Sequence, residues 1–354
     1  MEKKIKTNEA SCPSCGATMR YSPERKKLFC ENCETCKEIP FEQILEKHQW
    51  DKREQTTKQT KEWAEETKNL KCPNCGANVI LNKLEYSKSC PYCSSSLVGD
   101  VSELPSLPPD GIIPFTFSNE EAVNKYVAGI KKKWFVPNAF KKAPPVENIH
   151  GVYVPCFSYD AKTESVYSGT LATDHHYRDS NGRTHTTTTY KHISGTHKHN
   201  HVDVLVETSS KMNQKQLDDI QPYNTTEIVK FNQSFIMGYT VEHYENTVEE
   251  CKVISEKIMD ERNKNAILAG YHYDRVESFS IKSDFSEEKY MYYLLPTYKC
   301  DYMYKEKKYT TFMNGQTGKV GGGYPKSPVK ITLFVLFILL IVIGIAVLSS
   351  LGGK

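Results

Sequence analysis

Two closely spaced pairs of cysteines, which occur twice at a fixed offset, constrain this 354-residue chain more than any other feature. The motif CPSCGA at Cys12 returns as CPNCGA at Cys72, and CENC at Cys30 returns as CPYC at Cys90. Both units have fourteen residues between their inner cysteines, and they are in register at an offset of 60 residues. The spacing therefore indicates an internal duplication of one small metal-binding unit.

A C-x₂-C turn brings two sulfur atoms to one metal ion, and a second turn completes a tetrahedral shell of four thiolates around Zn²⁺. Four protein ligands leave no open coordination position, so we expect two structural zinc ions rather than catalytic ones. Each unit has only about 22 residues, too few for a hydrophobic core, and the metal would supply its folding free energy. The predicted ligands are Cys12, Cys15, Cys30 and Cys33 for one ion and Cys72, Cys75, Cys90 and Cys93 for the other.

Other uses of these cysteines fit the same spacing. An iron ion in a rubredoxin-like site is bound by similar cysteine turns. Disulfides are a further alternative, but they would require an oxidising compartment. Cys36 lies three residues after Cys33 and could replace it as a ligand, although the register with the second unit favours Cys33. We expect Cys156, Cys251 and Cys300 to be ordinary buried or unpaired thiols.

The second constraining feature is the stretch 331–348, in which every residue except Thr332 is apolar or glycine. With the residues that follow it reaches about 20 residues, enough at roughly 1.5 Å each to cross a ~30 Å hydrocarbon layer. The chain as a whole has a mean hydropathy of −0.56, so a polar body precedes an apolar tail. We predict one transmembrane helix over 331–351, rather than a buried core helix, after a flexible tether over 321–330.

The charges around this stretch predict its orientation. Lys326 and Lys330 lie just before it, and positive charge marks the cytoplasmic side of a span. Thiolate metal sites also persist best in a reducing compartment. No apolar signal sequence follows Met1. We therefore expect a single-pass protein of the cell membrane, anchored by its tail, with the N-terminal body in the cytoplasm.

The fold class that we predict is α+β, with two zinc ribbons in front of a body that contains antiparallel strands. A short amphipathic helix is expected from Phe41 to His48, at the start of a helical spacer. The spacer is either solvated or a partner-binding helix that uses Trp50 and Trp63. The predicted segments are the first ribbon at 10–38, the spacer at 39–70, the second ribbon at 71–98 and the α+β domain at 110–320.

Within the α+β domain, Ser118 and Glu121 form a capping box that opens a helix, with Val123, Val127, Ile130 and Trp134 on one face. Pro155 is expected to bend its strand or to lie at a sheet edge. A long hairpin over 166–206 should turn at 179–182. The other expected helices are 211–220 and 248–269, and the other strands are 112–117, 151–160, 271–281, 290–304 and 308–313.

Seven of the eleven histidines lie in that hairpin. His197, His199 and His201 would share one face of a strand, because side chains alternate, and could form a secondary transition-metal site. The alternative is a polar, threonine-rich outer face in which histidine is tolerated.

The charge balance argues against nucleic acid as a partner. Residues 1–110 carry 17 Lys and Arg against 17 Asp and Glu, and two zinc ions with eight thiolates would bring the region to about −4. Affinity for nucleic acid needs basic residues that neutralise phosphates. The chain also contains no P-loop, GxGxxG, HExxH or GxSxG motif, so we expect a protein that is not an enzyme, although catalytic residues can be scattered.

The order and content of several motifs resemble a bacterial family of transcription factor IIB-type zinc-ribbon membrane proteins. The matching motifs are CPNCGANV at Cys72, CPYC at Cys90, IIPFTFSNEEAV at Ile112, KKWFVPNAFK at Lys132, GVYVPCFSYDA at Gly151, YSGT at Tyr167, SSKM at Ser209, LLPTYKCDYMY at Leu294 and FMNGQTGKVGG at Phe312. The resemblance implies a C-terminal membrane segment. It also implies an association with phage-shock-protein-A-like and SPFH-domain (flotillin-like) proteins in the envelope-stress response of Gram-positive bacteria.

These observations together predict a non-enzymatic, tail-anchored cytoplasmic adaptor that recruits protein partners to the membrane. Two alternatives remain open at this point: a zinc-ribbon protein linked to transcription or nucleic acid, and a metal sensor or metallochaperone that uses the histidine-rich hairpin.

Overall fold

The computed structural model describes residues 11–43, 46–51, 67–72, 76–82, 88–89, 96–97, 107–142, 149–180, 182–209 and 211–351. Its architecture is mixed α+β with antiparallel sheets, as predicted. The helices are α2 (Asn119–Lys132), α3 (Asn138–Lys142), α4 (Gln214–Ile220), α5 (Val248–Leu268) and α6 (Pro328–Leu351), with short 3-10 helices η2 (Thr225–Glu227) and η3 (Gln233–Ile236).

Three sheets contain the described strands. The first ribbon forms the antiparallel sheet β1 (Arg20–Ser22), β2 (Lys27–Phe29) and β3 (Cys36–Lys37), and β7 (Lys88–Ser89) pairs with β8 (Ser96–Leu97). The main sheet contains β4 (His48–Gln49), β5 (Thr67–Lys71), β6 (Asn78–Asn82), β9 (Gly111–Ile112), β10 (Ile149–Arg178), β11 (Thr184–Glu207), β12 (Val229–Lys230), β13 (Thr240–Glu242), β14 (Arg275–Tyr304), β15 (Lys307–Asn314) and β16 (Val320–Gly322). The main sheet therefore extends from the second cysteine unit into the body.

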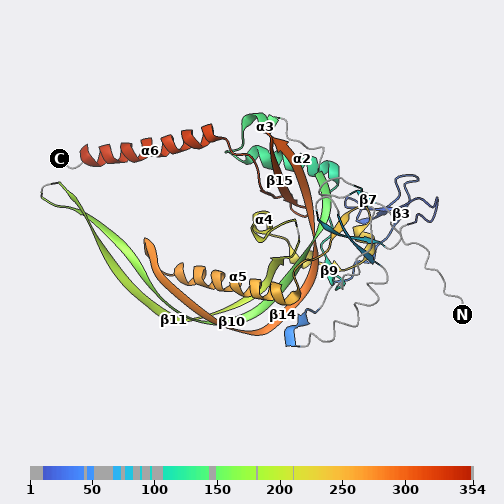
Figure 1. Cartoon of the computed structure of the whole chain (residues 1–354), viewed down its shortest axis with the longest axis horizontal. Coiled ribbons are helices and arrows are strands. Elements are labelled where there is room, and N and C mark those ends of the chain that lie inside the picture. Colours follow the sequence, from blue (N-terminus) through green and yellow to red (C-terminus); the bar gives the residue numbers. More distant parts are fainter. Residues whose placement is uncertain are drawn as a thin grey trace.

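Three long strands, β10, β11 and β14, leave the body together and form a curved arm (Figure 1). The predicted hairpin turn is confirmed: β10 ends at Arg178, β11 begins at Thr184, and Asp179 exchanges backbone hydrogen bonds of 3.0 Å with Gly182 and Arg183. Helix α5 lies along the concave side of the arm. Its capping box, Thr247 with Glu250, fixes where this helix begins.

The arm corrects the prediction for Pro155. The strand is not interrupted at this residue, and β10 lies inside the sheet, with β14 on one side and first β13, then β11, on the other. Pro155 pairs with Leu294 on one side, but on the other side β10 changes its neighbour at this point, from β13 up to Tyr153 to β11 from Cys156 onward. A residue without an N–H is tolerated in this gap between two partners.

The segment between the cysteine units also differs from the prediction. Residues 46–49 are not helical, because His48 and Gln49 form β4 and pair with Tyr290 and Lys289 of β14. Lys47 lies 2.6 Å from carboxylate oxygens of both Asp160 and Asp203, at the bulge where the arm begins. The end of the predicted helical spacer is likewise a strand, β5; residues 52–66, which include Trp63, lie outside the described residues.

Two further differences concern the first elements of the body. Of the predicted strand 112–117, only Ile112 belongs to the paired strand β9, since the chain then passes through the core and buries Ile113, Phe115 and Phe117. Helix α2 begins at the predicted cap, where the Ser118 hydroxyl accepts the N–H of Glu121. Its buried face is Ala122, Tyr126 and Ile130, whereas Trp134 lies beyond its end and is 61 % exposed.

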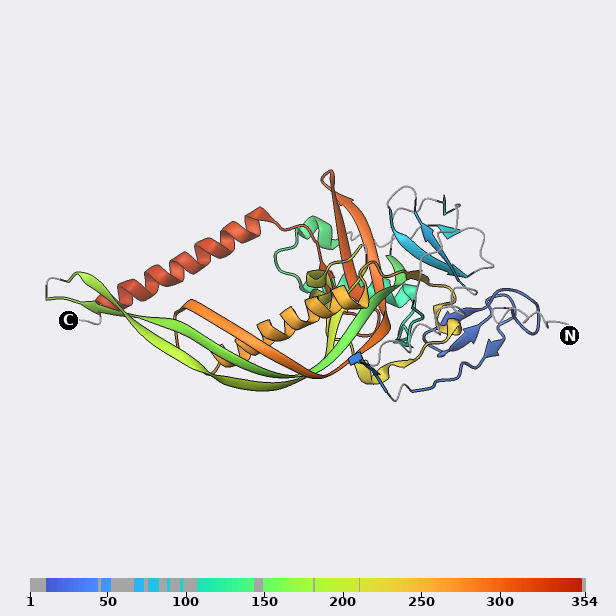
Figure 2. The same cartoon turned by 60° about the horizontal axis from the view of Figure 1, so that its bottom comes forward.

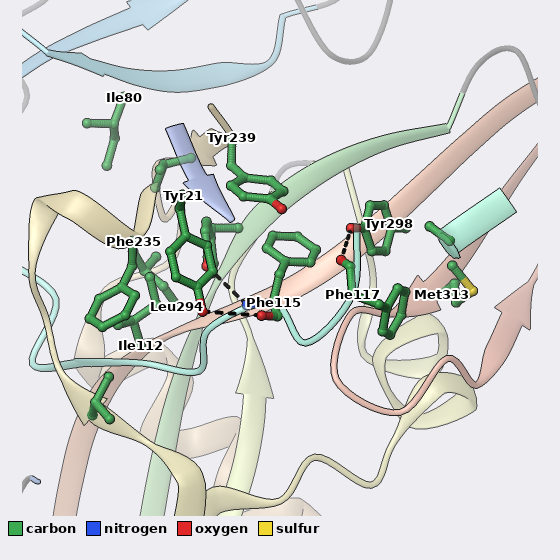
Figure 3. Packing of buried hydrophobic residues seen from close by; sticks show 14 of the residues in the cluster. Tyr21, Ile80, Ile112, Phe115, Phe117, Phe235, Tyr239, Leu294, Tyr298 and Met313 are labelled. Carbon is green, nitrogen blue, oxygen red and sulfur yellow. Dashed lines mark hydrogen bonds between the residues drawn. The ribbon is translucent and has the colours of Figure 1, made fainter. Parts of the chain in front are cut away.

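The first ribbon and the body share one hydrophobic core. Tyr21 of the ribbon contacts Phe235 edge to face at 5.4 Å, and its hydroxyl faces the carbonyl oxygen of Phe115 at 3.5 Å (Figure 3). Phe115 in turn stacks on Tyr239 at 4.2 Å. Because the buried side chains are continuous from ribbon to body, the ribbon has a fixed position on the body.

Helix α6 extends from the body on the same side as the arm. In both views the polar tip of the arm, between Arg178 and Thr184, lies close to the C-terminal end of α6 (Figures 1 and 2). The segment before α6 is part of the fold rather than a free tether, because Val320–Gly322 pairs with β15 and Gly323 donates a backbone hydrogen bond of 3.0 Å to Thr310.

Candidate metal centre and membrane helix

The first cysteine unit brings four sulfur atoms together. The Sγ atoms of Cys12, Cys15, Cys30 and Cys33 all lie within 4.8 Å of one another. Cys12 Sγ is 3.4 Å from Cys33 Sγ, and Cys15 Sγ is 3.5 Å from Cys30 Sγ. A tetrahedral zinc site with Zn–S bonds of about 2.3 Å requires sulfur atoms about 3.8 Å apart. The four thiols are free, and their spacing fits one zinc ion.

Local backbone geometry explains why these residues converge. In the first turn, Cys12 accepts the N–H of Gly16 at 2.9 Å and donates to the carbonyl of Ala17 at 2.8 Å. In the second, Cys30 accepts from Glu34 at 2.9 Å and donates to Thr35 at 3.0 Å. Both turns need a left-handed residue, which is Gly16 (φ +74°) in the first and Glu34 (φ +60°) in the second. The first turn therefore has the less strained sequence.

The same turns lower the pKa of two thiols. Burial would raise the pKa of Cys12, but the backbone N–H groups of Cys15 and Ser14 outweigh it and lower that pKa to about 6. The side chain of Asn32 and the backbone of Ala17 lower the pKa of Cys15. Hydrogen bonds that stabilise a thiolate prepare it as a metal ligand, because the ligand binds in its deprotonated form.

Cys36 does not take part in the cluster. It lies on β3, is exposed, and its Sγ atom is 3.6 Å from Arg25 Nη1. Cys33 occupies the fourth position, as the register with the second unit predicts. The thiols of Cys156, Cys251 and Cys300 are buried in the body, where burial raises their pKa values. Their environment is that of ordinary core cysteines.

The second unit repeats the backbone pattern of the first where the structure describes it. Cys72 is buried, donates to the carbonyl of Ala77 at 2.7 Å and accepts from Gly76 at 2.8 Å. Gly76 has φ +72°, within 2° of Gly16. Cys75, Cys90 and Cys93 lie outside the described residues. The structure therefore shows one four-cysteine cluster that can hold a metal ion, and the second stays a prediction.

The three hairpin histidines share one face of β11, as alternation requires. Their rings form a row, with centroids 6.0 Å apart for His197 and His199 and 4.5 Å for His199 and His201. His201 is buried against α5, where its Nε2 atom contacts Asn263 Oδ1 at 3.0 Å, and burial lowers its pKa to about 4. Asn263 also donates to Thr163 and Ser165 of β10, so His201 helps to hold α5 on the arm.

Among the residues that the structure describes, the cluster around Cys12 is the one group of three or more His, Cys, Asp or Glu residues whose ligand atoms meet within 4.8 Å. The histidine row does not reach this spacing. In the arrangement described, it does not form a three-histidine metal site.

Helix α6 is long and apolar enough to cross a membrane: residues 328–347 have a mean hydropathy of 2.9, and none of this stretch is buried within the protein. Its first turn contacts the corner between α2 and α3. The N–H of Ser327 donates to Phe135 O at 2.7 Å, and Lys330 Nζ donates to Trp134 O, Val136 O and Asn138 Oδ1 at 3.1, 2.9 and 2.7 Å.

Sequence reasoning missed this corner. The helical period at 131–137 (KKKWFVP) predicts a continuing helix that has Trp134 on the same face as Ile130. Two signals could have identified it: tryptophan flanked by lysines is typical of a membrane interface, and the chain returns to lysines just before the apolar stretch.

Comparison with known proteins finds a relative without assigned function. The chain is similar to the uncharacterized protein YdjG of Bacillus subtilis strain 168, with 27 % identity over 333 residues that cover 90 % of this chain and 91 % of the relative. No protein-family model matches the chain, and no solved structure matches it.

Proposed function

We propose that this protein is a tail-anchored, non-enzymatic adaptor of the cell membrane that presents zinc ribbons and an extended arm to cytoplasmic protein partners. The observation that carries the proposal is the closed shell of four cysteines around Cys12 in a chain that also contains an exposed apolar helix. A four-thiolate shell leaves no coordination position for a substrate, so its role is to fix a surface rather than to perform chemistry.

The fixed position of the first ribbon supports this role. Its sheet is attached to the body through Tyr21 and through the backbone hydrogen bond from Tyr21 N to Met237 O at 3.0 Å. A ribbon that only needed to fold would not need this attachment. A ribbon held against the body instead forms one composite surface, which suits recognition of another protein.

The resemblance stated above suggests the class of partner. We propose a phage-shock-protein-A-like or SPFH-domain protein on the cytoplasmic side, with a role in envelope stress. For nucleic acid, the described residues offer no added support, and the charge count of the ribbon region stays unfavourable. A metal-sensing role for the hairpin is disfavoured by the row of histidines, in which His201 already binds Asn263.

A bilayer around α6 restricts where the arm can lie. The tip carries exposed His175, His176 and Arg178, and such side chains do not enter hydrocarbon. Yet in the structure the tip lies next to the C-terminal end of α6. We therefore propose that α6 and the arm diverge in the membrane, with Ser327 remaining on Phe135.

The adaptor proposal is tested by crosslinking and mass spectrometry on native membranes that contain the full chain. We expect crosslinks from ribbon lysines to a cytoplasmic protein of one of the two classes above, and we expect the variant Cys12→Ser to lose them. Cys36→Ser is the matched control, because it removes a thiol of the same ribbon that lies outside the cluster. Equal crosslinking by both variants, or crosslinks confined to lipid-embedded proteins, would contradict the proposal.

Orientation needs a separate measurement. Protease added to intact cells should leave the body undigested, whereas protease added to inverted vesicles should digest it. Digestion in intact cells would place the body outside and would rule out cytoplasmic partners.

A further inference from the structure

The corner between α2 and α3 has the composition of a surface that contacts lipid. Residues 131–142 and 324–330 contain seven lysines and no acidic residue. The two segments are almost 200 residues apart in the sequence, and the fold brings them together through the bond from Ser327 to Phe135. This bond precedes α6, so the corner stays beside the start of the span at whatever angle the helix leaves it.

Aromatic rings occupy the side of the corner that faces α6. Trp134 and Phe135 are stacked with ring centroids 6.0 Å apart, and both contact Phe334 edge to face, at 5.7 and 5.5 Å. Phe334 lies in the second turn of the apolar helix. Trp134 thus touches the membrane helix while 61 % of its surface is exposed, which is the position of a residue in an interfacial aromatic belt.

A cleft of about 400 Å³ is lined by residues from both segments of the corner. Its lining includes Lys133, Lys215 and Lys326 as well as Tyr324, and a single acidic residue, Asp219. Asp219 already faces the backbone N–H of Gly322 at 3.4 Å, while Lys133 lies over the ring of Tyr324 at 5.5 Å. The cleft is therefore polar, cationic and located where α6 leaves the body.

The lysines at this corner lie close enough together for one to lower the pKa of another. Burial and the nearby ammonium group of Lys330 lower the pKa of Lys141. An anion would relieve this repulsion. The anionic groups that stand at this depth beside a membrane helix are phospholipid headgroups.

We propose that the corner of α2, α3 and the segment before α6 binds the phosphate headgroups of anionic phospholipids, with Trp134 inserted at the level of the headgroups. This inference rests on α6 crossing the membrane, as proposed above. The consequence for function is that the leaflet holds the body at two points, the helix and the corner. The orientation of the ribbons relative to the membrane then depends on lipid charge.

The test measures which lipids approach Trp134. The full chain is placed in nanodiscs in which a fixed fraction of the lipid carries brominated tails, either on phosphatidylglycerol or on phosphatidylcholine. Bromine quenches the fluorescence of nearby tryptophan, and the difference in quenching between wild type and Trp134→Phe isolates the signal of this residue. We expect roughly three- to tenfold enrichment of phosphatidylglycerol over phosphatidylcholine around Trp134.

Two charge-matched variants separate local binding from overall charge. Replacement of Lys132, Lys142, Lys215 and Lys326 by Gln should abolish the enrichment. Replacement of four exposed lysines of the arm and α5, Lys191, Lys198, Lys257 and Lys282, by Gln changes net charge equally and should leave the enrichment intact. If both sets behave alike, the corner is not the binding site and the proposal is wrong.

Inorganic phosphate distinguishes lipid from a soluble anion. At an ionic strength matched with chloride, added phosphate should not displace brominated phosphatidylglycerol. Displacement would show a site for a free anion and would overturn the lipid assignment. Quenching that is equal for the two lipids would reject the site while leaving the adaptor proposal standing, because crosslinking of the ribbons does not depend on lipid charge.

Discussion

The backbone N–H of Tyr21 donates a hydrogen bond of 3.0 Å to the carbonyl oxygen of Met237, which joins the first ribbon to the body. The ring of Tyr21 is 4 % exposed and packs against Phe235. The four-cysteine cluster and the body are therefore not independent units. A change at this contact should affect the position of the ribbon before it affects the metal shell.

We predict that Tyr21→Ala detaches the ribbon from the body and lowers the free energy of unfolding by about 3–5 kcal/mol, the usual range for removal of a large buried aromatic side chain. Tyr21→Phe is the matched control. It keeps the ring and loses only the long 3.5 Å contact to Phe115 O, so we expect less than about 1 kcal/mol. Hydrogen exchange of the β1 and β2 amides measures the effect of both variants. Equal protection in Tyr21→Ala and wild type would show that the contact does not hold the ribbon.

Metal content gives the second prediction. The purified full chain should hold one zinc ion in the first unit, and two if the second unit folds as its backbone at Cys72 indicates. Cys12→Ser should reduce the zinc content by one ion per chain, and Cys36→Ser should not change it. Elemental analysis decides this, with exchange of the β1–β3 amides as the structural readout. Unchanged zinc in Cys12→Ser would show that this thiol is not a ligand.

The features that the sequence predicted are those determined by local chemistry. The convergence of Cys12 with Cys33 follows from turn spacing, and the start of α2 follows from the hydroxyl of Ser118. The hairpin turn at Asp179 likewise needs only a few neighbouring residues. Each of these features depends either on hydrogen bonds between residues fewer than six positions apart in the sequence or on the grouping of four cysteines around one site.

The features that it missed depend on partners far along the chain. His48 follows a helical pattern of apolar residues, but it pairs with Tyr290 and with Asp110, so tertiary contacts override the local preference. Pro155 is tolerated inside the sheet because β10 changes its neighbour there, which no local pattern reveals. Trp134 lies at the predicted helical period, yet α2 ends before it and α6 contacts it from another part of the chain.

The contact between His48 and Asp110 predicts a pH dependence of stability. The 2.6 Å hydrogen bond from the ring to the Asp110 carboxylate raises the pKa of His48, and partial burial opposes this only in part. The pKa of His48 is therefore higher in the folded state than its unfolded value of about 6.5. Its contact with Asp110 contributes its full stabilisation below about pH 6.5. The contribution is lost as the pH rises through the folded pKa of His48.

His48→Gln should therefore lower the free energy of unfolding more at pH 6 than at pH 8, with a difference of up to about 1 kcal/mol for this partly exposed pair. Chemical denaturation of the full chain in detergent measures it. His272→Gln serves as the control, because His272 is exposed and lies outside this contact. A loss that is the same at both pH values would show that the ion pair does not contribute.

The arm provides the last prediction, because its polar tip and the apolar α6 need different solvents. Tyr177 lies near the tip and is 56 % exposed among histidine and threonine side chains, whereas Ile338 lies in the middle of α6 and is 43 % exposed. A bilayer that surrounds Ile338 excludes charged groups, so the tip must turn toward water when the helix is embedded. Spin labels attached through unnatural amino acids at these two positions, in the full chain in liposomes, report their surroundings. We expect the label at Tyr177 to collide with a water-soluble relaxation agent, and the label at Ile338 to collide with oxygen dissolved in the lipid. If both labels respond to oxygen alone, the arm lies within the membrane beside α6 and the proposed divergence is wrong.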